Sequence, residues 1–403
     1  MRYAKLFGLL TSLSLISTTH AAAWFELEGT GTSFTQRVMV TIENPADVPT
    51  EAALVHLPLN ELRSTLPDAK DGQVAVVDPT TKKAHREQAD KNFVPFQVSN
   101  DTLIFAVPLK AHESKQLFIY TSPQHAILPG FPAKTGYDSR HAYRSFENNL
   151  MAFRMETGPG ANTTGMAVDL FGKSKKGQGL RLVEIYEQGD YHHPQTWGVD
   201  ILKVGSGPGS AGAYVIAGDE MGRPAADQTN VNCVYSGPVE TLIRATAPVK
   251  IGDRTVTLVR NLTLVADDRS IHDTIEIQGD NLQGLQLGLG IRDLPNPTWR
   301  EVPDKGYTMI TGDNNQPGCK VVGMSAVFSP SLYVKTIDLP DKKNGGHVYV
   351  LNTQKTEHRI ASIWDGDGQI NNAADLEKTL QRWSDLRDHP IKIEVAKEAE
   401  KKG

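Results

Sequence analysis

Short runs in which apolar and polar residues alternate recur along most of this 403-residue chain. Val38, Val40 and Ile42 would share one face of an extended strand, because successive side chains of a strand point to opposite faces. The same alternation marks residues 255–265 and 271–277. Pro, Asn, Asp, Gly and Ser bound these runs, as they usually bound the strands of a sandwich. The sequence therefore predicts a mostly β protein.

The spacing of these runs divides the chain into two predicted domains. Residues 24–122 contain several short strand patterns and no helical one, which suits an immunoglobulin-like β-sandwich. Residues 123–145 carry prolines and glycines and few apolar pairs, so they are expected to be a linker. Residues 146–396 predict a large antiparallel β-sandwich, and the charged residues 397–403 predict a frayed tail.

A helix is expected near the carboxyl end of the second domain. Asn372 can cap its first turn, with Asp375 three residues later, and Pro390 follows its end. Its apolar face would consist of Leu376, Leu380, Trp383 and Leu386. Because these four residues recur at helical spacing, the helix is expected to pack on the sandwich without a chemical role.

The amino-terminal residues have the pattern of a secretory signal. Arg2 and Lys5 precede an apolar run over residues 6–16, and residues 21–23 are alanines that suit cleavage. The run is too short to span a bilayer core of about 30 Å. We therefore assign residues 1–23 to a signal peptide and expect the mature protein in the periplasm or outside the cell.

Composition and charge narrow the class of partner. The formal net charge of −5 gives no electrostatic drive toward nucleic acid or an anionic membrane. No later stretch is apolar enough for a transmembrane helix. Neither a nucleic-acid partner nor membrane insertion is therefore expected.

The two cysteines, Cys233 and Cys319, are too few for a zinc cluster. An oxidising compartment would permit a disulfide between them, and two separate buried thiols are the alternative.

Two short motifs resemble cofactor sites, but neither fits its cofactor. The glycines of residues 207–212 follow the dinucleotide spacing, yet residues 213–217 predict a strand where that fold needs a helix. Asp365 and Asp367 resemble the start of a calcium loop, but the position that needs a bidentate Glu holds Leu376. A glycine-rich hairpin and a tight turn are predicted instead, and no cofactor or metal is expected.

One segment combines polar and aromatic residues more densely than the rest. It comprises Asp190, Tyr191, His192, His193, Trp197, Asp200 and Lys203. Histidine can act as a general base, and tyrosine can exchange a proton when its surroundings allow it. Pro194 favours a loop, which would let neighbouring histidines enter one site, and Trp197 could stack on a sugar ring. The alternative is a surface loop with one buried, hydrogen-bonded histidine.

A set of motifs around this segment points to a known family. In chain order they are Glu147-Asn148-Asn149, Phe153-Arg154, Asp169, Asp190-Tyr191-His192, Gly198-x-Asp200-x-x-Lys203-Val204-Gly205, the strand of residues 260–264 and the Trp-containing helix. Over roughly residues 139–395 the chain resembles the family called domain of unknown function 4861. Members of that family often accompany enzymes that dismantle acidic polysaccharides such as pectin. The resemblance also implies a galactose-mutarotase-like sandwich for the second domain and a carbohydrate ligand.

The function that the resemblance implies is action on uronate-containing glycans, and β-elimination is its sharpest form. That reaction needs a cation at the uronate carboxyl, a base for the C5 proton and an acid for the leaving oxygen. The catalytic candidates are Tyr191, His192 and His193. The substrate-binding candidates are Arg154, Trp197, Asp200, Lys203, Arg260 and Glu147.

Three other functions remain open at this point. Glycoside hydrolysis would use two carboxylates from among Glu147, Asp169, Asp190 and Asp200. A glycan-binding protein without catalysis would present aromatic residues on an open face. A structural component of the envelope would use the amino-terminal sandwich as its functional surface.

Overall fold

The protein is described by a computed structural model covering residues 23–85, 93–128, 130–139, 143–158, 166–179, 182, 189–202, 204–205, 207–313, 322–341, 345–366, 368, 370 and 372–402. Across this part the chain is mostly β, which confirms the expected fold class. No helix in these ranges is both long and apolar enough to cross a membrane. Most of the predicted signal peptide, Lys203, Cys319 and Asp367 lie outside the described residues, so the assignments made for them stay predictions.

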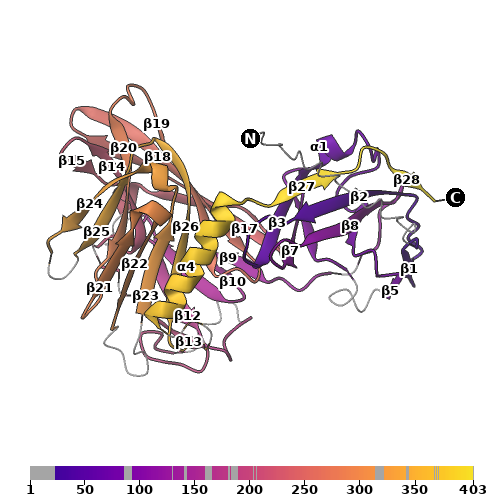
Figure 1. The fold of residues 1–403 in the computed structure, drawn as a ribbon, viewed down its shortest axis with the longest axis horizontal. Helices are drawn as coiled ribbons and strands as arrows, with labels where there is room; N and C mark the ends of the chain where they lie inside the picture. The colour runs from indigo at the N-terminus through magenta and orange to yellow at the C-terminus, as the bar shows by residue number, and fades with distance from the viewer. Residues whose placement is uncertain are drawn as a thin grey trace, which may run out of the picture.

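The amino-terminal sandwich packs two sheets around a common core (Figure 1, indigo and purple). One sheet has the order β27 (Lys392–Val395), β2 (Gln36–Glu43), β8 (Ser114–Thr121) and β4 (Val74–Val77), and the other has β3 (Thr50–Pro58), β7 (Thr102–Leu109) and β6 (Phe96–Ser99). A short pair, β1 (Glu26–Glu28) and β5 (Lys83–His85), and a helical turn, α1 (Leu59–Leu62), complete it. Val38, Val40 and Ile42 are buried in this core, as the alternation predicts.

The carboxyl-terminal segment belongs to this first sandwich. The sequence predicts a frayed tail over residues 397–403, but the structure places β28 (Glu400–Lys401) there, paired with the start of β2. β27, which falls inside the range expected for the second domain, pairs with the rest of β2. The guanidinium of Arg37 forms an ion pair with Glu400 at 2.6 Å. The tail is ordered because it satisfies the backbone groups of a strand that would otherwise be an open edge.

The larger sandwich has two main sheets around its core. The broad sheet runs β16 (Asn230–Ser236), β17 (Glu240–Ile251), β18 (Arg254–Val265), β19 (Ser270–Gln278), β26 (Lys355–Trp364), β23 (Val322–Val327), β22 (Tyr307–Gly312) and β21 (Thr298–Val302). The narrow sheet runs β15 (Glu220–Gly222), β14 (Ser210–Ala217), β20 (Leu285–Arg292), β25 (Gly346–Leu351) and β24 (Tyr333–Leu339). Neighbouring strands in both sheets are antiparallel, as expected. β14 begins inside the glycine run, so no helix starts there.

A third sheet, which we call the site sheet, packs on the same core. Its order is β13 (Gly198–Asp200), β12 (Asp169–Lys173), β11 (Met151–Glu156), β10 (Tyr143–Asn148) and β9 (Thr135–Asp138). Phe146, Phe153 and Leu170 point from it into the main core. β9 and the first residues of β10 lie in the stretch expected to be a linker. They are strands instead, because β9 pairs with β10, with Gly136 opposite Glu147.

The predicted helix is α4 (Ala373–Asp388), and its cap is confirmed by the N–H of Asp375, which donates to the Asn372 side chain at 3.0 Å. Its apolar residues are buried against the outside of β22 and β23 (Figure 1). Short 3₁₀ helices occupy Ala226–Gln228, Pro303–Lys305 and Pro330–Leu332.

Candidate functional site

The strand register of the site sheet brings several candidate residues onto one face. We call this face, which points away from the main core, the outer face. On this face one row of directly paired residues crosses β10, β11, β12 and β13. It consists of Glu147, Ala152, Phe171 and Asp200. In the next row Arg154 lies opposite Asp169. Because neighbouring strands are about 4.8 Å apart and successive residues about 3.4 Å apart, the backbones that carry Arg154, Asp169 and Asp200 lie within roughly 12 Å of one another.

A loop of residues 189–197 lies over this face. The ring of Tyr191 lies 5.9 Å from the ring of Phe171, and the N–H of Asp200 donates to the Tyr191 carbonyl at 2.9 Å. The ring of His192 is 4.3 Å from the Tyr191 ring. The sequence expectation of a loop here is met, and the loop presents Tyr191 and His192 side by side.

His192 and Asp200 form a histidine–carboxylate pair. Nδ1 of His192 lies 3.1 Å from Oδ2 of Asp200, and the other Asp200 oxygen accepts from the N–H of Leu202 at 3.2 Å. The Asp200 side chain is 3% exposed and the imidazole is 48% exposed. A neutral histidine that donates from Nδ1 carries its lone pair on Nε2, so the pair is arranged to take up a proton at Nε2.

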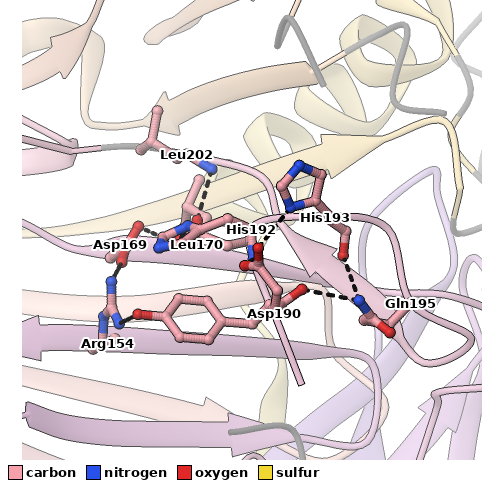
Figure 2. A network of polar contacts seen from close by, with 10 residues as sticks. Arg154, Asp169, Leu170, Asp190, His192, His193, Gln195 and Leu202 are labelled. Atoms are coloured by element: carbon pink, nitrogen blue, oxygen red, sulfur yellow. Dashed lines mark hydrogen bonds and ion pairs between the residues drawn. The ribbon is translucent and has the colours of Figure 1, made fainter. Parts of the chain in front are cut away.

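Arg154 stands behind the tyrosine. Its guanidinium carbon lies 5.1 Å from the Phe171 ring and 5.6 Å from the Tyr191 ring, and Nη1 is 3.5 Å from the Tyr191 hydroxyl. Its Nη2 donates to the Asp169 carboxylate (Figure 2). The structure thus joins Tyr191, His192, Arg154 and Asp200 in one cluster.

Asp169 is a buried acid with an unusual titration. Burial raises the pKa of its carboxyl to about 6, although the charge of Arg154 and the N–H of Leu170 act in the opposite direction. In its ionised form the Asp169 carboxylate neutralises the buried charge of Arg154.

His193 points away from this cluster. Its Nδ1 pairs with the exposed Asp190 carboxylate at 2.8 Å. The backbone N–H of His192 and the side chain of His193 hold the pKa of Asp190 below its usual range. These contacts stabilise the turn and keep the His193 side chain outside the cluster.

Glu147 sits at one end of the outer face, in a buried ion pair. Its carboxylate accepts from Nζ of Lys173 at 2.5 Å and from the N–H of Leu182. Both charged residues line a cavity of about 280 Å³, together with residues 132–136 and Asn149. Lys173 was missed by the sequence analysis, although it continues the outward alternation of Asp169 and Phe171 along β12.

Two other candidates do not fit their expected contact with a substrate. Trp197 is 2% exposed and packs with Phe171 and Leu182, so its ring offers no open face to a sugar. Arg260 is fully buried inside the larger sandwich, where it pairs with Asp273 at 2.6 Å and donates to the carbonyls of Met166 and Ala211. The carboxylate partner of Arg260, Asp273, also pairs with the buried His358, and the sequence did not indicate either contact.

Comparison with solved structures places the fold among large β-rich proteins. A protein of the glycosyl hydrolase family 38 from Enterococcus faecalis matches with a TM-score of 0.50 at 9% identity, over 89% of this chain and 47% of that one. An alpha-mannosidase from Enterococcus faecalis V583 matches with a TM-score of 0.48 at 9% identity, over 89% of this chain and 46% of that one. The chain spans a little under half the length of each, and at this identity the likeness concerns the fold alone.

Comparison with protein families covers most of the chain. No curated protein matches the sequence significantly. The model of the domain of unknown function DUF4861 matches residues 42–393, which include strands of both sandwiches and the candidate cluster. The chain therefore belongs to the DUF4861 family.

Proposed function

We propose that this protein is an exported enzyme that cleaves uronate-containing glycans by β-elimination. The observation that carries the proposal is the His192–Asp200 pair beside Tyr191 and Arg154. A half-exposed imidazole that is oriented by a buried carboxylate is a suitable general base. A tyrosine hydroxyl next to a guanidinium is a suitable partner for the second proton transfer.

The residues account for each step of the reaction. Nε2 of His192 removes the C5 proton, and the electron pair left on C5 forms the C4–C5 double bond. The C4–O bond breaks, and the Tyr191 hydroxyl donates its proton to the departing oxygen. Arg154 supplies positive charge beside Tyr191, where the uronate carboxyl would lie. This charge is least offset when Asp169 is protonated, so acidic pH should favour binding of the carboxyl.

Carbohydrate as the ligand class has two supports outside the site. The family resemblance implies an association with enzymes that dismantle acidic polysaccharides, because members of the family often accompany them. The fold is similar to that of a protein of glycosyl hydrolase family 38, which makes a sugar ligand a reasonable choice. Sugar polymers of this kind lie outside the cytoplasm, which agrees with the signal-like residues 1–23.

Hydrolysis is a second candidate, and one observation favours it. Asp169 carries a pKa raised to about 6 by burial, which is the property of a general acid in a glycosidase. A second carboxylate, Asp200, lies one strand away on the outer face. Hydrolysis would produce a new reducing end without a double bond.

Product analysis with matched variants tests the proposal. Mature protein is incubated with uronate oligosaccharides, and the ultraviolet absorbance of a C4–C5 double bond and the number of reducing ends are both recorded. His192→Ala should lower the rate about 10²-fold or more, because a proton-transfer group is lost. His193→Ala is the control and should keep most of the activity.

Three results would contradict β-elimination by His192. Equal rates for His192→Ala and His193→Ala would show that His192 takes no specific part in the reaction. Reducing ends without absorbance would show hydrolysis. Binding of the oligosaccharides without any product would show a glycan-binding protein.

Export has its own test. Amino-terminal sequencing of the protein accumulated in its native host should begin at Ala22, Ala23 or Trp24, because the signal peptidase cleaves after small residues. An intact Met1 on the accumulated protein would refute export by this signal.

A further inference from the structure

A pocket on the broad sheet lies near the start of β26, at the end opposite Trp364. It displays a regular array of polar side chains. His272 and Thr274 of β19 point outward, and so do Arg359 and Glu357 of β26. The register pairs His272 with Arg359 and Thr274 with Glu357, so the four side chains form a rectangle on adjacent strands. Cross-strand neighbours lie about 5 Å apart and alternate residues about 7 Å apart.

Arg359 is the arginine of this array, and its charge is only partly compensated. Within the described residues its guanidinium donates no hydrogen bond, and its nearest carboxylate oxygen is Oδ2 of Asp268 at 3.9 Å. That oxygen already bonds Nε2 of His272 at 2.9 Å. The other Asp268 oxygen accepts from the N–H and the hydroxyl of Ser270. Asp268 is therefore shared among several donors.

The titration of Arg359 agrees with this geometry. Burial lowers the pKa of Arg359 and the charge of Arg382 lowers it further, while Asp268 and Glu51 offset only part of the effect. A half-buried guanidinium in this position gains free energy from an additional anion. The Arg359 side chain is 24% exposed, so an anion in the pocket can reach it.

The rest of the pocket is apolar or already bonded. Val327 of β23 is the register partner of Arg359 on the other side, Leu386 lies in the last turn of α4, and Pro390 follows that helix. Arg387 lines the pocket too, but its guanidinium bonds backbone carbonyls such as that of Phe328 and the carboxylate of Asp388. The cavity measures about 250 Å³. This is below the range of about 300–1,000 Å³ for drug-sized ligands, so it suits a single sugar ring.

We propose that this pocket binds one carboxylated sugar residue, with its carboxylate on Arg359. Glu357, Thr274 and His272 accept or donate hydrogen bonds to the ring hydroxyls, and Val327, Leu386 and Pro390 contact the apolar face of the ring. The choice of a uronic acid rests on the proposed function, whereas the anion preference rests on Arg359. The pocket is separate from the cluster around His192 and would hold a glycan away from the cleavage site.

Binding of a monosaccharide to the full chain tests this pocket without involving catalysis. Galacturonate and glucuronate are titrated by calorimetry, with the corresponding neutral sugars, inorganic phosphate and acetate as comparison ligands. At least one uronate should bind, and the neutral sugars should bind about tenfold more weakly or not at all. Arg359→Gln should weaken uronate binding about tenfold or more.

Further variants separate binding from folding. Glu357→Gln changes an exposed side chain, so its fold should be intact, and it should weaken uronate but not acetate. Arg300→Gln, at an exposed arginine that pairs with Glu377, is the matched control and should bind like the unaltered chain. The uronate titration requires no product, so a failed cleavage assay with the unaltered chain leaves the binding result at Arg359 independent.

Other outcomes would overturn the proposal. If phosphate or acetate bound as tightly as the uronate, the pocket would be a site for simple anions and not for a sugar residue. Equal uronate affinity in Arg359→Gln, Glu357→Gln and the unaltered chain would show that this pocket is not the site.

Discussion

The imidazole of His192 owes its properties to two neighbours. Asp200 fixes which ring nitrogen carries the proton, and Tyr191 lies against one side of the ring. His193, one residue further, has an exposed carboxylate as its partner and no such enclosure. Adjacent residues of the same type are therefore placed in different chemical surroundings by one turn of the chain.

Asp200→Asn tests the orientation of His192. The amide keeps the size of the side chain but can donate to Nδ1, which favours the tautomer with the proton on Nε2. If His192 is the base, kcat should fall by about 10²- to 10⁴-fold with little change in KM. Steady-state kinetics on a uronate oligosaccharide, with circular dichroism as a check of folding, would measure this. An unchanged kcat would refute the role of Asp200.

Asp169 makes a pH-dependent contribution to stability whose sign follows from its raised pKa. The unfolded chain releases this proton near pH 3.9, while the folded chain holds it up to about pH 6. The stabilisation by the neutral carboxyl is therefore present below about pH 4 and is lost as the pH rises through about 6. In Asp169→Asn this loss should be absent.

Urea unfolding at about pH 4.5 and about pH 7.5 measures the effect. Relative to Asp169→Asn, the unaltered chain should lose about 1–3 kcal/mol of unfolding free energy between these values. A difference that stays constant with pH would contradict the raised pKa.

Arg260 shows where residue-by-residue prediction from sequence stops. Its charge suggested a ligand contact, but Leu258, Leu262 and Leu264 share its side of β18, and that alternation indicates an inward side chain. The compensating partner, Asp273, comes from the next strand, and its position depends on a register that the sequence does not state.

At the level of elements, sequence patterns predicted the strands and the helix whose formation depends on local interactions. The alternating strands and α4 with its Asn372 cap are fixed by neighbours within a few residues, and the structure confirms them. The site sheet was harder, because β9 has an apolar pattern too short to recognise. Its strand character comes from pairing with β10.

Asn372→Ala tests the contribution of the cap to α4. Loss of the bond from the N–H of Asp375 should lower the unfolding free energy by about 0.5–2 kcal/mol. Lys378→Ala, at an exposed position of the same helix, is the control and should change it by about 0.5 kcal/mol or less. Equal effects of the two changes, in thermal or urea unfolding, would show that the cap is not stabilising.

At the level of the whole molecule, α4 leads the chain from the larger sandwich back to the smaller one (Figure 1). The strands that follow it complete the sheet that contains β2. No local pattern predicts this, because the paired residues are more than 300 positions apart and the tail is charged. The division of the chain into domains at residues 123–145 stays a prediction, but the first sandwich includes residues from both ends of the described chain.

Removing residues 391–403 should destabilise the first sandwich selectively. Amides of β2 should exchange faster by about tenfold or more, because β27 and β28 no longer cover that edge. Amides of β18, inside the broad sheet, should keep their protection. Hydrogen exchange followed by mass spectrometry would measure both, and unchanged exchange in β2 would refute the role of the tail.

The pairing of β2 with β27 and β28 has a consequence for biosynthesis. A ribosome makes β2 and β8 long before β27 and β28, so one edge of β2 stays open until these later strands are made. Until then the chain keeps an unpaired β edge, a state that a translocation channel can still thread and that a chaperone can recognise. Stalled nascent chains that lack β27 and β28 should therefore remain protease-sensitive around β2, while released chains that contain both strands become resistant.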